Sequence, residues 1–282
     1  MTTVKILDVL KEMSSKKEVL VSFNLFNNAS INGVLRAAQK VNRPVMLGVT
    51  ERDLAHYGLE ELVKTVRIKA ERIGVITALH LDHGMSLEAA VRCIRAGFSS
   101  VMLDPSGLEP EKRILVVREV MDFARSAGVM VESMVGQLRL ALDDIQGEGV
   151  SKEELTDPAE AASFVRETGI DILAVSVGTE HGSAIAGKEE EIDMPRLRAI
   201  AEAVPVPLVV HGGSGVSAGQ LRELRNYHVG KMNIGGAIRV AYTRAIMKAL
   251  TENPYIDMND ADAAGEEAIC ETAAGKLRTL SC

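Results

Sequence analysis

The chain has 282 residues, of which 46% are hydrophobic and 25% charged, a composition typical of a folded globular protein rather than a disordered or collagen-like one. Its 39 acidic residues outnumber 32 Lys and Arg, which gives a formal net charge of -7, and only 3% of residues are aromatic. A chain without a basic excess or stacking platforms is poorly suited to nucleic acid or to an anionic membrane, so we expect neither as a partner.

The cysteines and the N-terminal residues indicate where the protein works. Three cysteines, Cys93, Cys270 and Cys282, are an odd number without metal-type spacing, which fits a reducing compartment better than a disulfide framework. Residues 1-17 predict an amphipathic helix rather than a signal peptide, and no later segment has ~18 unbroken apolar residues. We therefore expect a cytoplasmic protein.

Eight short segments rich in Val, Ile and Leu predict β-strands, and they alternate with stretches whose apolar residues recur every three or four positions, as in helices. The predicted strands are 19-24, 44-50, 75-82, 100-104, 129-136, 172-178, 208-213 and 231-236. The first strand is not followed by G-x-G-x-x-G, which argues against a doubly wound sheet with a second domain. We predict an α/β fold, a single (β/α)8 barrel domain over residues 1-282, with an N-terminal helix and a C-terminal helical extension.

Polar residues lie at the C-terminal ends of the predicted strands, where barrel enzymes carry their active sites. They are Asn24, Thr50, Asp82 with His83, Asp104, His181, His211 and Asn233. Imidazoles from His83, His181 and His211 could together bind Zn2+ with one coordination position left open, whereas a single strand-end histidine is more often a hydrogen-bonded structural residue. For His80, inside the third strand, the structural role is favoured, and His56 and His228 fit surface or helix-end positions.

Glycine-rich turns follow the last three predicted strands, at Gly182, at Gly212-Gly213-Ser214 and at Gly235-Gly236. Such turns let backbone N-H groups approach a phosphate, although glycine also serves tight turns for conformational reasons alone. The loops after strands seven and eight are a frequent phosphate site in barrels, so the pattern favours a phosphorylated substrate. No lysine ends a predicted strand, since Lys231 begins the eighth, and this disfavours Schiff-base chemistry.

Five motifs in this order resemble the class II, zinc-dependent ketose-bisphosphate aldolases of the fructose- and tagatose-bisphosphate type. They are ALHLDHG (78-84), CIRAGFSSVMLD (93-104), GTEHG (178-182), LVVHGGSG (208-215) and KMNIGG (231-236). The resemblance implies one Zn2+ per chain held by His83, His181 and His211, with Asp82 as the acid/base on the substrate hydroxyl. It also implies a homo-oligomer, a dimer or tetramer.

The resemblance further implies how the substrate is bound. The phosphate end would lie on Gly182, Gly212, Ser214, Asn233 and the backbone at Gly235-Gly236, with Na+ or K+ nearby; we add Asn24, Thr50 and Gly213 as contacts. Asp104 and Glu132 are expected to orient the metal ligands.

The sequence departs from the family at strand five and in the long stretch that follows it, which we expect to form a loop or lid over 137-157. Family members read VEAELG and then a loop Glu that takes the proton from the enediolate-forming carbon. Here the chain reads VESMVG, so that Met134 replaces the second carboxylate, and Leu142 falls near the position of the loop Glu. Asp143 or Asp144 is the expected substitute.

The family's Asp-Pro-Arg/Lys motif, which supplies a cation for a distal phosphate, is also missing, and the chain has IDMND instead. This favours a ketose 1-phosphate, unless Arg139 takes over that contact. The leading hypothesis is an aldolase that cleaves a phosphorylated ketose to dihydroxyacetone phosphate and an aldehyde through a zinc-stabilised enediolate. The alternatives are another metal-dependent enediolate reaction, either an epimerisation or a non-phosphate aldol cleavage, and a non-catalytic partner subunit of an aldolase.

Overall fold

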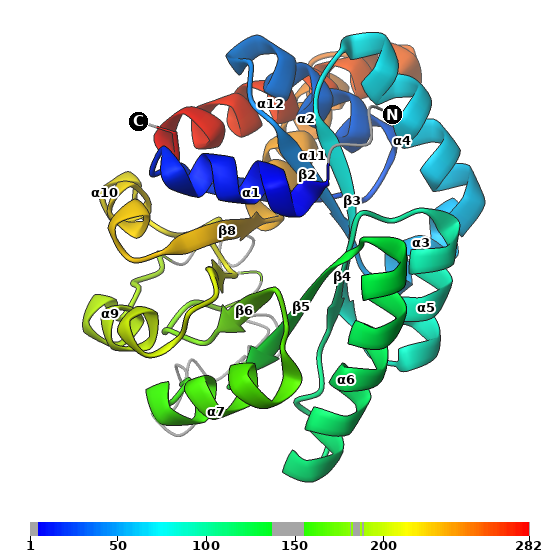
Figure 1. Cartoon of the computed structure of the whole chain (residues 1–282). Helices are drawn as coiled ribbons and strands as arrows, with labels where there is room; N and C mark the ends of the chain where they lie inside the picture. The colour runs from blue at the N-terminus through cyan, green and yellow to red at the C-terminus, as the bar shows by residue number, and fades with distance from the viewer. Residues whose placement is uncertain (1–4, 137–154, 181, 183–186, 188, 282) are drawn as a thin grey trace.

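Eight parallel strands close into a barrel in the computed structural model, which describes residues 5-136, 155-180, 182, 187 and 189-281 (Figure 1). The strands are β1 (Leu20–Asn24), β2 (Val45–Val49), β3 (Thr77–Gly84), β4 (Ser100–Leu103), β5 (Met130–Val135), β6 (Ile172–Val175), β7 (Leu208–Val210) and β8 (Val229–Ile234). Each strand pairs with its neighbour in sequence, and β8 closes the barrel on β1. The predicted (β/α)8 barrel is confirmed.

The predicted strand limits differ from the observed ones by at most three residues, and β3 begins and ends two residues later than predicted. β6 and β7 end earlier than predicted because the chain turns away from the sheet, with positive φ angles of 96° at Gly178 and 74° at Gly212. β8 begins at Val229, which pairs with Leu208, so Lys231 lies within the strand rather than at its start.

Helices surround the barrel as the apolar spacing predicts. They are α1 (Ile6–Ser15), α2 (Asn28–Val41), α3 (Glu51–Tyr57), α4 (Leu59–Ile73), α5 (Leu87–Ala96), α6 (Pro110–Ala127), α7 (Pro158–Thr168), α9 (Met194–Ala203), α10 (Ala218–Glu223), the 3-10 helix η1 (Leu224–Asn226), α11 (Gly236–Glu252) and α12 (Met258–Thr279). Side-chain caps begin several of them, such as Ser86 on α5 and Asp157 on α7, and left-handed glycines such as Gly97 end them.

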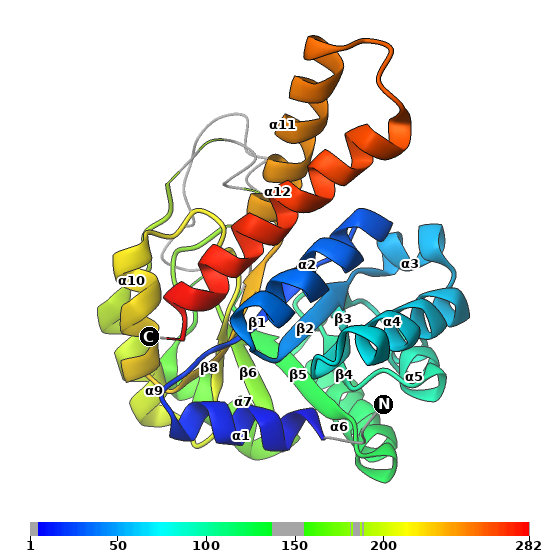
Figure 2. The ribbon, with the colours of Figure 1, turned by 90° about the horizontal axis from the view of Figure 1, so that it is seen from above.

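The N-terminal helix α1 closes the end of the barrel at which the strands begin (Figure 2). Its buried residues Ile6, Val9, Leu10 and Met13 pack in one apolar cluster with side chains that point into the barrel. The strand members of that cluster are Leu20, Met46, Ala78, Met102, Met130, Met134, Ile172, Ala174 and Val209. The interior is therefore apolar at this end, and polar residues occupy the opposite end.

The C-terminal helices α11 and α12 form a hairpin that extends beyond the strand ends opposite α1 (Figure 2). The base of α12 packs against α2, where Gly33 leaves space for Ile269, while Met247, Tyr255 and Met258 near the tip are exposed. Within the described residues, no helix is long and apolar enough to cross a membrane.

Candidate functional site

The end of β3 brings two neighbouring side chains to one point, which a regular strand does not do. Successive side chains of a strand point to opposite faces, so Asp82 inside the barrel would leave His83 pointing outward. The β3–β4 register shifts between Leu81 and Gly84, and His83 adopts φ 50°, in the left-handed region that few non-glycine residues enter. This bulge allows Asp82 and His83 to reach the same site, and strained backbone of this kind is common at functional sites.

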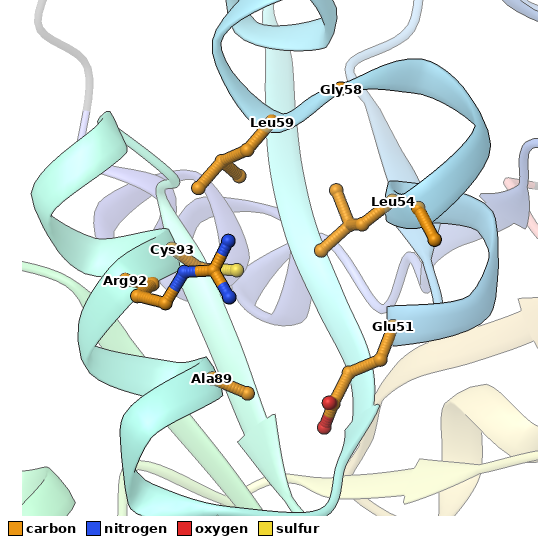
Figure 3. Close-up of a pocket in the computed structure, with 8 residues that line it drawn as sticks. Glu51, Leu54, Gly58, Leu59, Ala89, Arg92 and Cys93 are labelled. Carbon is orange, nitrogen blue, oxygen red and sulfur yellow. The ribbon is translucent and has the colours of Figure 1, made fainter.

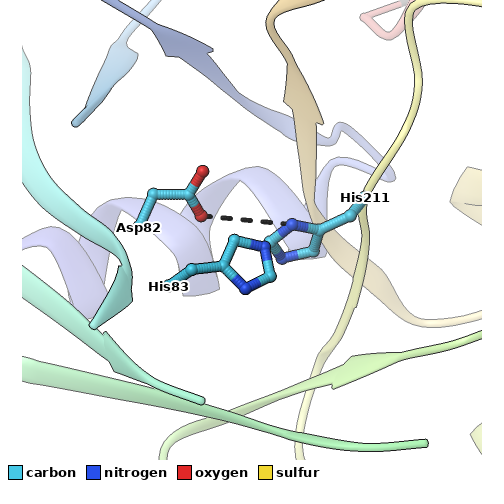
Figure 4. A group of neighbouring side chains, drawn as sticks. All are labelled: Asp82, His83 and His211. Carbon is cyan, nitrogen blue, oxygen red and sulfur yellow. Dashed lines mark ion pairs between the residues drawn. The ribbon is translucent and has the colours of Figure 1, made fainter. Parts of the chain in front are cut away.

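His211 joins this pair from the turn directly after β7. Its ring centroid lies 4.9 Å from that of His83, and its Nδ1 lies 4.0 Å from Oδ1 of Asp82 (Figure 4). One possible ligand atom from each of Asp82, His83 and His211 lies within 4.8 Å of the others. Two imidazoles and a carboxylate at this spacing form a group that could hold a metal ion.

Asp82 is held in one orientation by two amide groups from the first and last strands. Nδ2 of Asn24 donates to Oδ2 at 2.5 Å, and Nδ2 of Asn233 donates to Oδ1 at 3.0 Å. Burial would raise the pKa of Asp82, but the neighbouring His83, His211 and Lys231 lower it below its ordinary value. The carboxylate is therefore ionised at neutral pH and has a fixed position.

Each of the two described histidines of the group contacts a further carboxylate. Nδ1 of His83 lies 2.9 Å from Oδ2 of Asp104, and Nε2 of His211 lies 3.0 Å from Oε1 of Glu132. Asp104 is itself held by the N-H of Ser106, which donates to Oδ1 at 3.0 Å. A histidine that donates one N-H to a carboxylate carries a lone pair on its other nitrogen, which can act as an acceptor or a metal ligand. For His211 that nitrogen is Nδ1, which lies 3.3 Å from Nδ2 of Asn233.

The pKa shifts of these groups follow from burial and charge. Burial would raise the pKa of Asp104, but the contact with His83 and the Ser106 N-H lower it to about 2. Burial lowers the pKa of His211, so that its imidazole is neutral, as a metal ligand must be. For His83, burial acts to lower the pKa, but Asp82 and Asp104 raise it overall.

Below this group the barrel interior contains a buried ion pair. Nζ of Lys231 donates to Oε2 of Glu132 at 2.6 Å and lies 3.1 Å from Nε2 of His80, whose Nδ1 lies 2.9 Å from the Ser100 hydroxyl. Burial would raise the pKa of Glu132, but Lys231 and the hydrogen bond to His211 lower it to about 2. Burial and Lys231 lower the pKa of His80 to about 3, so it is a neutral, hydrogen-bonded residue of the interior.

The glycine-rich turn after β7 lies beside the N-terminus of α11. The Ser214 hydroxyl accepts from the N-H of Ala237 at 3.1 Å, and the N-H of Gly213 donates to the Asn233 carbonyl at 3.0 Å. A Cβ at Gly212 would lie 2.7 Å from the Glu180 carbonyl, so glycine is required there for close approach.

Gly235, the N-cap of α11, lies against Asn24, so the β1, β7 and β8 turns meet at one place. Gly236 is the first residue of α11, whose N-terminal amides point toward this place. Nζ of Lys276, on α12, donates to the carbonyls of Gly213 and Ser214 at 3.2 and 3.3 Å and anchors the turn.

Other predicted residues take different positions. The Thr50 hydroxyl caps α3, where it accepts from the N-H of Asp53 at 3.2 Å. Gly182 has φ 84°, a conformation suited to glycine. His181, Asp143, Asp144 and Arg139 lie outside the described residues, as does most of the predicted 137-157 loop.

A hollow of about 270 Å³ lies away from this site, between α3, α4 and α5 (Figure 3). Leu54 and Leu59 line it together with Arg92 and Cys93, and burial raises the pKa of the Cys93 thiol to about 12. None of the residues that line the hollow belongs to the Asp82, His83 and His211 group.

Sequence reasoning missed Lys231, Lys276 and the β3 bulge. The alternation of side chains along a strand could have shown that Lys231 points into the barrel, because residues at i and i+2 share a face. Lys231 lies two residues before Asn233, just as His80 lies two residues before Asp82. No sequence pattern indicated the positive φ of His83 or the contact from α12.

A parallel eight-stranded barrel with histidines and a carboxylate gathered at the C-terminal strand ends is an arrangement typical of barrel enzymes, and this group could hold a metal ion. Residues 4–282 match the family model described as "Fructose-bisphosphate aldolase class-II". A fructose-bisphosphate aldolase of Geobacillus stearothermophilus is 33% identical over 283 residues, which cover 99% of this chain and 96% of that protein. The chain therefore belongs to the class II fructose-bisphosphate aldolase family, a family of carbon-carbon lyases.

Solved structures agree with this assignment. The YdjI aldolase from Escherichia coli K12 superposes with a TM-score of 0.82 at 26% identity, covering 98% of this chain and 96% of that one. A fructose-1,6-biphosphate aldolase candidate from Coccidioides immitis gives a TM-score of 0.85 at 25% identity, covering 99% of this chain and 97% of that one.

Proposed function

We propose that the protein is a zinc-dependent aldolase that cleaves or forms a phosphorylated ketose, with dihydroxyacetone phosphate and an aldehyde as the other partners of the reaction. The observation that carries this proposal is the convergence of Asp82, His83 and His211 at the mouth of the barrel. Membership of the class II family supports it independently.

The donor set fits a divalent metal. With Nδ1 of His83 on Asp104 and Nε2 of His211 on Glu132, the proposed ligand atoms are Nε2 of His83 and Nδ1 of His211. Zn2+ favours imidazole nitrogen in sites that keep an open position. We propose His181 as the third ligand, since it follows Glu180 directly in the chain. A divalent ion bound there would polarise the substrate carbonyl and stabilise negative charge on its oxygen.

Asp82 is the proposed acid/base. In cleavage it accepts the proton of the hydroxyl on the carbon whose bond breaks, and in condensation it returns that proton. The two amides from Asn24 and Asn233 keep its oxygens in place, which limits the motion that a proton transfer would otherwise require. The buried Oδ1 of Asn233 has no described hydrogen-bond partner and is available to a substrate hydroxyl.

The proposed phosphate site lies where the Ser214 turn meets the N-terminus of α11. The amides of a helix N-terminus favour an anion, and Gly235 and Gly236 let a phosphate approach them closely. Gly182, Gly212, Gly213, Thr50 and a bound Na+ or K+ remain proposed contributors to substrate binding. Asp143 or Asp144 is the proposed base for the carbon proton, and a ketose 1-phosphate is the proposed substrate class.

Release of dihydroxyacetone phosphate from a panel of phosphorylated ketoses tests the proposal. We expect turnover of at least one ketose 1-phosphate, loss of turnover after chelation, and recovery with added Zn2+. Cleavage that survives complete metal removal would contradict the metal-dependent mechanism. Epimerisation of the same sugars without release of a three-carbon product would favour the alternative enediolate reaction, and a metal-free chain that never turns over would favour a partner subunit.

We also propose that the protein is a cytoplasmic homo-oligomer. Met247, Tyr255 and Met258 near the tip of the α11–α12 hairpin are 62%, 95% and 65% exposed, and large apolar residues gathered on a protruding element favour contact with another chain. Light scattering on the purified protein tests the oligomer, and a monomer at micromolar concentration would contradict it.

A further inference from the structure

Lys276 reaches the turn after β7 from a helix that lies far along the chain. It belongs to the last turn of α12, and its side chain is half-buried. Nζ donates to the Gly213 oxygen at 3.2 Å and to the Ser214 oxygen at 3.3 Å. Helix side chains lean toward the N-terminus of their helix, and α12 begins at the tip of the hairpin, so Lys276 leans toward the site end of the barrel (Figure 2).

The helix α12 is held in place by contacts other than those of Lys276. Its residues Ile269 and Leu277 are buried in the main apolar cluster of the protein. An ion pair between Lys40 and Glu271 joins the same helix to α2. Docking of α12 therefore does not account for a lysine whose ammonium group contacts the β7 turn.

The peptide group between Gly213 and Ser214 is the part of the turn that depends on Lys276. The N-H of Gly213 donates to the Asn233 carbonyl at 3.0 Å, and the Ser214 hydroxyl accepts from the N-H of Ala237 at 3.1 Å. These contacts hold the two residues but not the plane of the peptide that joins them. Glycine places little restriction on the rotation of that plane, so the contact from Lys276 to the Gly213 oxygen selects one orientation.

The same contact determines where the N-H of Ser214 points. In a trans peptide the C=O and N-H bonds point in opposite directions, so this N-H faces away from Lys276. Among the described residues, none accepts a hydrogen bond from it. An ammonium group on the oxygen side also polarises the peptide, which strengthens the N-H as a donor. A backbone N-H that is oriented in this way suits an anion such as phosphate.

We propose that Lys276 is a positioning residue for the phosphate site: by binding the oxygens of Gly213 and Ser214, it turns the N-H of Ser214 toward the phosphate of the substrate. Lys276 acts through the peptide and makes no contact with the phosphate itself. This role rests on the phosphate site proposed above, so the test combines a readout on the turn with readouts on phosphate binding.

The first readout is the orientation of the Gly213–Ser214 peptide in crystals grown without phosphate or sulfate. The parent chain is compared with Lys276→Met, which keeps a side chain of similar length but has no donor. We expect the Gly213 oxygen to face Nζ in the parent, and the peptide to be rotated or to occupy two orientations in the variant. An unchanged peptide in the variant would overturn the proposal, whatever the protein binds.

The second readout is the affinity for inorganic phosphate, followed at the Ser214 amide by 1H-15N NMR of the full-length chain. We expect a saturable shift in the parent and about 3- to 10-fold weaker binding in Lys276→Met, the size of one oriented hydrogen bond. The matched control is Lys40→Met, which removes the ion pair of α12 with Glu271 and should keep the affinity within about two-fold. Equal loss in both variants would mean that Lys276 acts through the packing of α12 and would overturn the proposal.

Cleavage kinetics separate positioning of the phosphate from an effect on the chemical step. A contact that is equal in the ground state and the transition state changes KM and leaves kcat nearly the same. We expect Lys276→Met to raise KM for a ketose 1-phosphate by about 3- to 10-fold, with kcat within about two-fold of the parent. A parent-like KM with a lowered kcat would contradict the proposal.

Lys276→Gln is a second variant for the case in which the apolar side chain prevents folding. Its amide is shorter than the lysine side chain and cannot bind both oxygens as Nζ does, so we expect the same loss of phosphate affinity. Parent-like affinity in either folded variant would reject the positioning role. If the parent chain binds no phosphate and cleaves no phosphorylated ketose, the proposed function fails, and the crystal structures still decide whether Lys276 orients the peptide.

Discussion

The two ends of the barrel interior are built in opposite ways. At the α1 end, Leu10 and Met13 pack with inward-pointing Leu, Met and Val side chains, and no specific orientation is required of them. At the other end, Asp82 is held by two amides and His211 by a carboxylate, so each polar group has one position. The first end contributes stability by removing apolar surface from water, and the second uses paired polar groups to fix the geometry of a site. Substitutions at the α1 end should therefore lower the free energy of unfolding, and substitutions at the other end should lower metal affinity or turnover.

The largest expected effect is that of Asp82→Asn on cleavage. The amide keeps the size of the side chain but cannot accept the hydroxyl proton, so turnover should fall by about 10²- to 10⁴-fold. The zinc content should match that of the parent, since the imidazoles are untouched. The assay is steady-state cleavage together with metal analysis, and parent-like turnover would assign the acid/base role to another residue.

Leu10→Ala tests the apolar end. Leu10 is fully buried between α1 and the strands, and its truncation should cost about 2–5 kcal/mol of unfolding free energy. The melting temperature should then fall by roughly 5–15 °C for a domain of this size, whereas kcat at a permissive temperature should remain within about two-fold. Calorimetry and a cleavage assay measure the two effects. A large loss of kcat in a folded variant would contradict the separation of the two ends.

Asp104→Asn tests the polar end with a conservative change. The amide preserves the shape of the side chain but removes the charge that holds Nδ1 of His83 at 2.9 Å, so Zn2+ affinity should fall by about 10- to 100-fold. The matched control is the same substitution at Asp171, a carboxylate at the α1 end that accepts from the N-H of Val131. Chelator competition on both variants should show the loss only for Asp104→Asn. Equal affinities would remove Asp104 from the metal site.

The smallest expected effect is the pH dependence of Asp171→Asn. Burial raises the pKa of Asp171, so the folded state binds its proton more tightly than the unfolded state. The stability linked to this proton is present below the ordinary carboxyl pKa and is lost as pH rises through the raised value. The group is partly exposed, so at pH 7 the amide should stabilise the chain by less than about 1 kcal/mol. Melting curves should show this gain shrinking toward pH 4, and a gain that grows as pH falls would contradict the sign.

The sequence predicted the barrel because strand and helix periodicities alternate with little interruption, and helix limits such as those of α4 and α7 follow directly from the apolar spacing and from Pro158 and Gly169. It also placed Asp82, His83 and His211 at one end of the fold. It could not predict that a bulge would turn His83 toward Asp82, because that conformation depends on the pairing of β3 with β4. Nor could spacing show that Lys231 contacts Glu132, since the two lie 99 residues apart in the chain.

Metal analysis of the parent protein beside His83→Ala, His211→Ala and the double variant tests the central claim most directly. We expect about one tightly bound divalent ion per chain in the parent, a weakened site in each single variant, and no retained ion in the folded double variant. A double variant that retains the metal content of the parent would show that these imidazoles do not form the metal site.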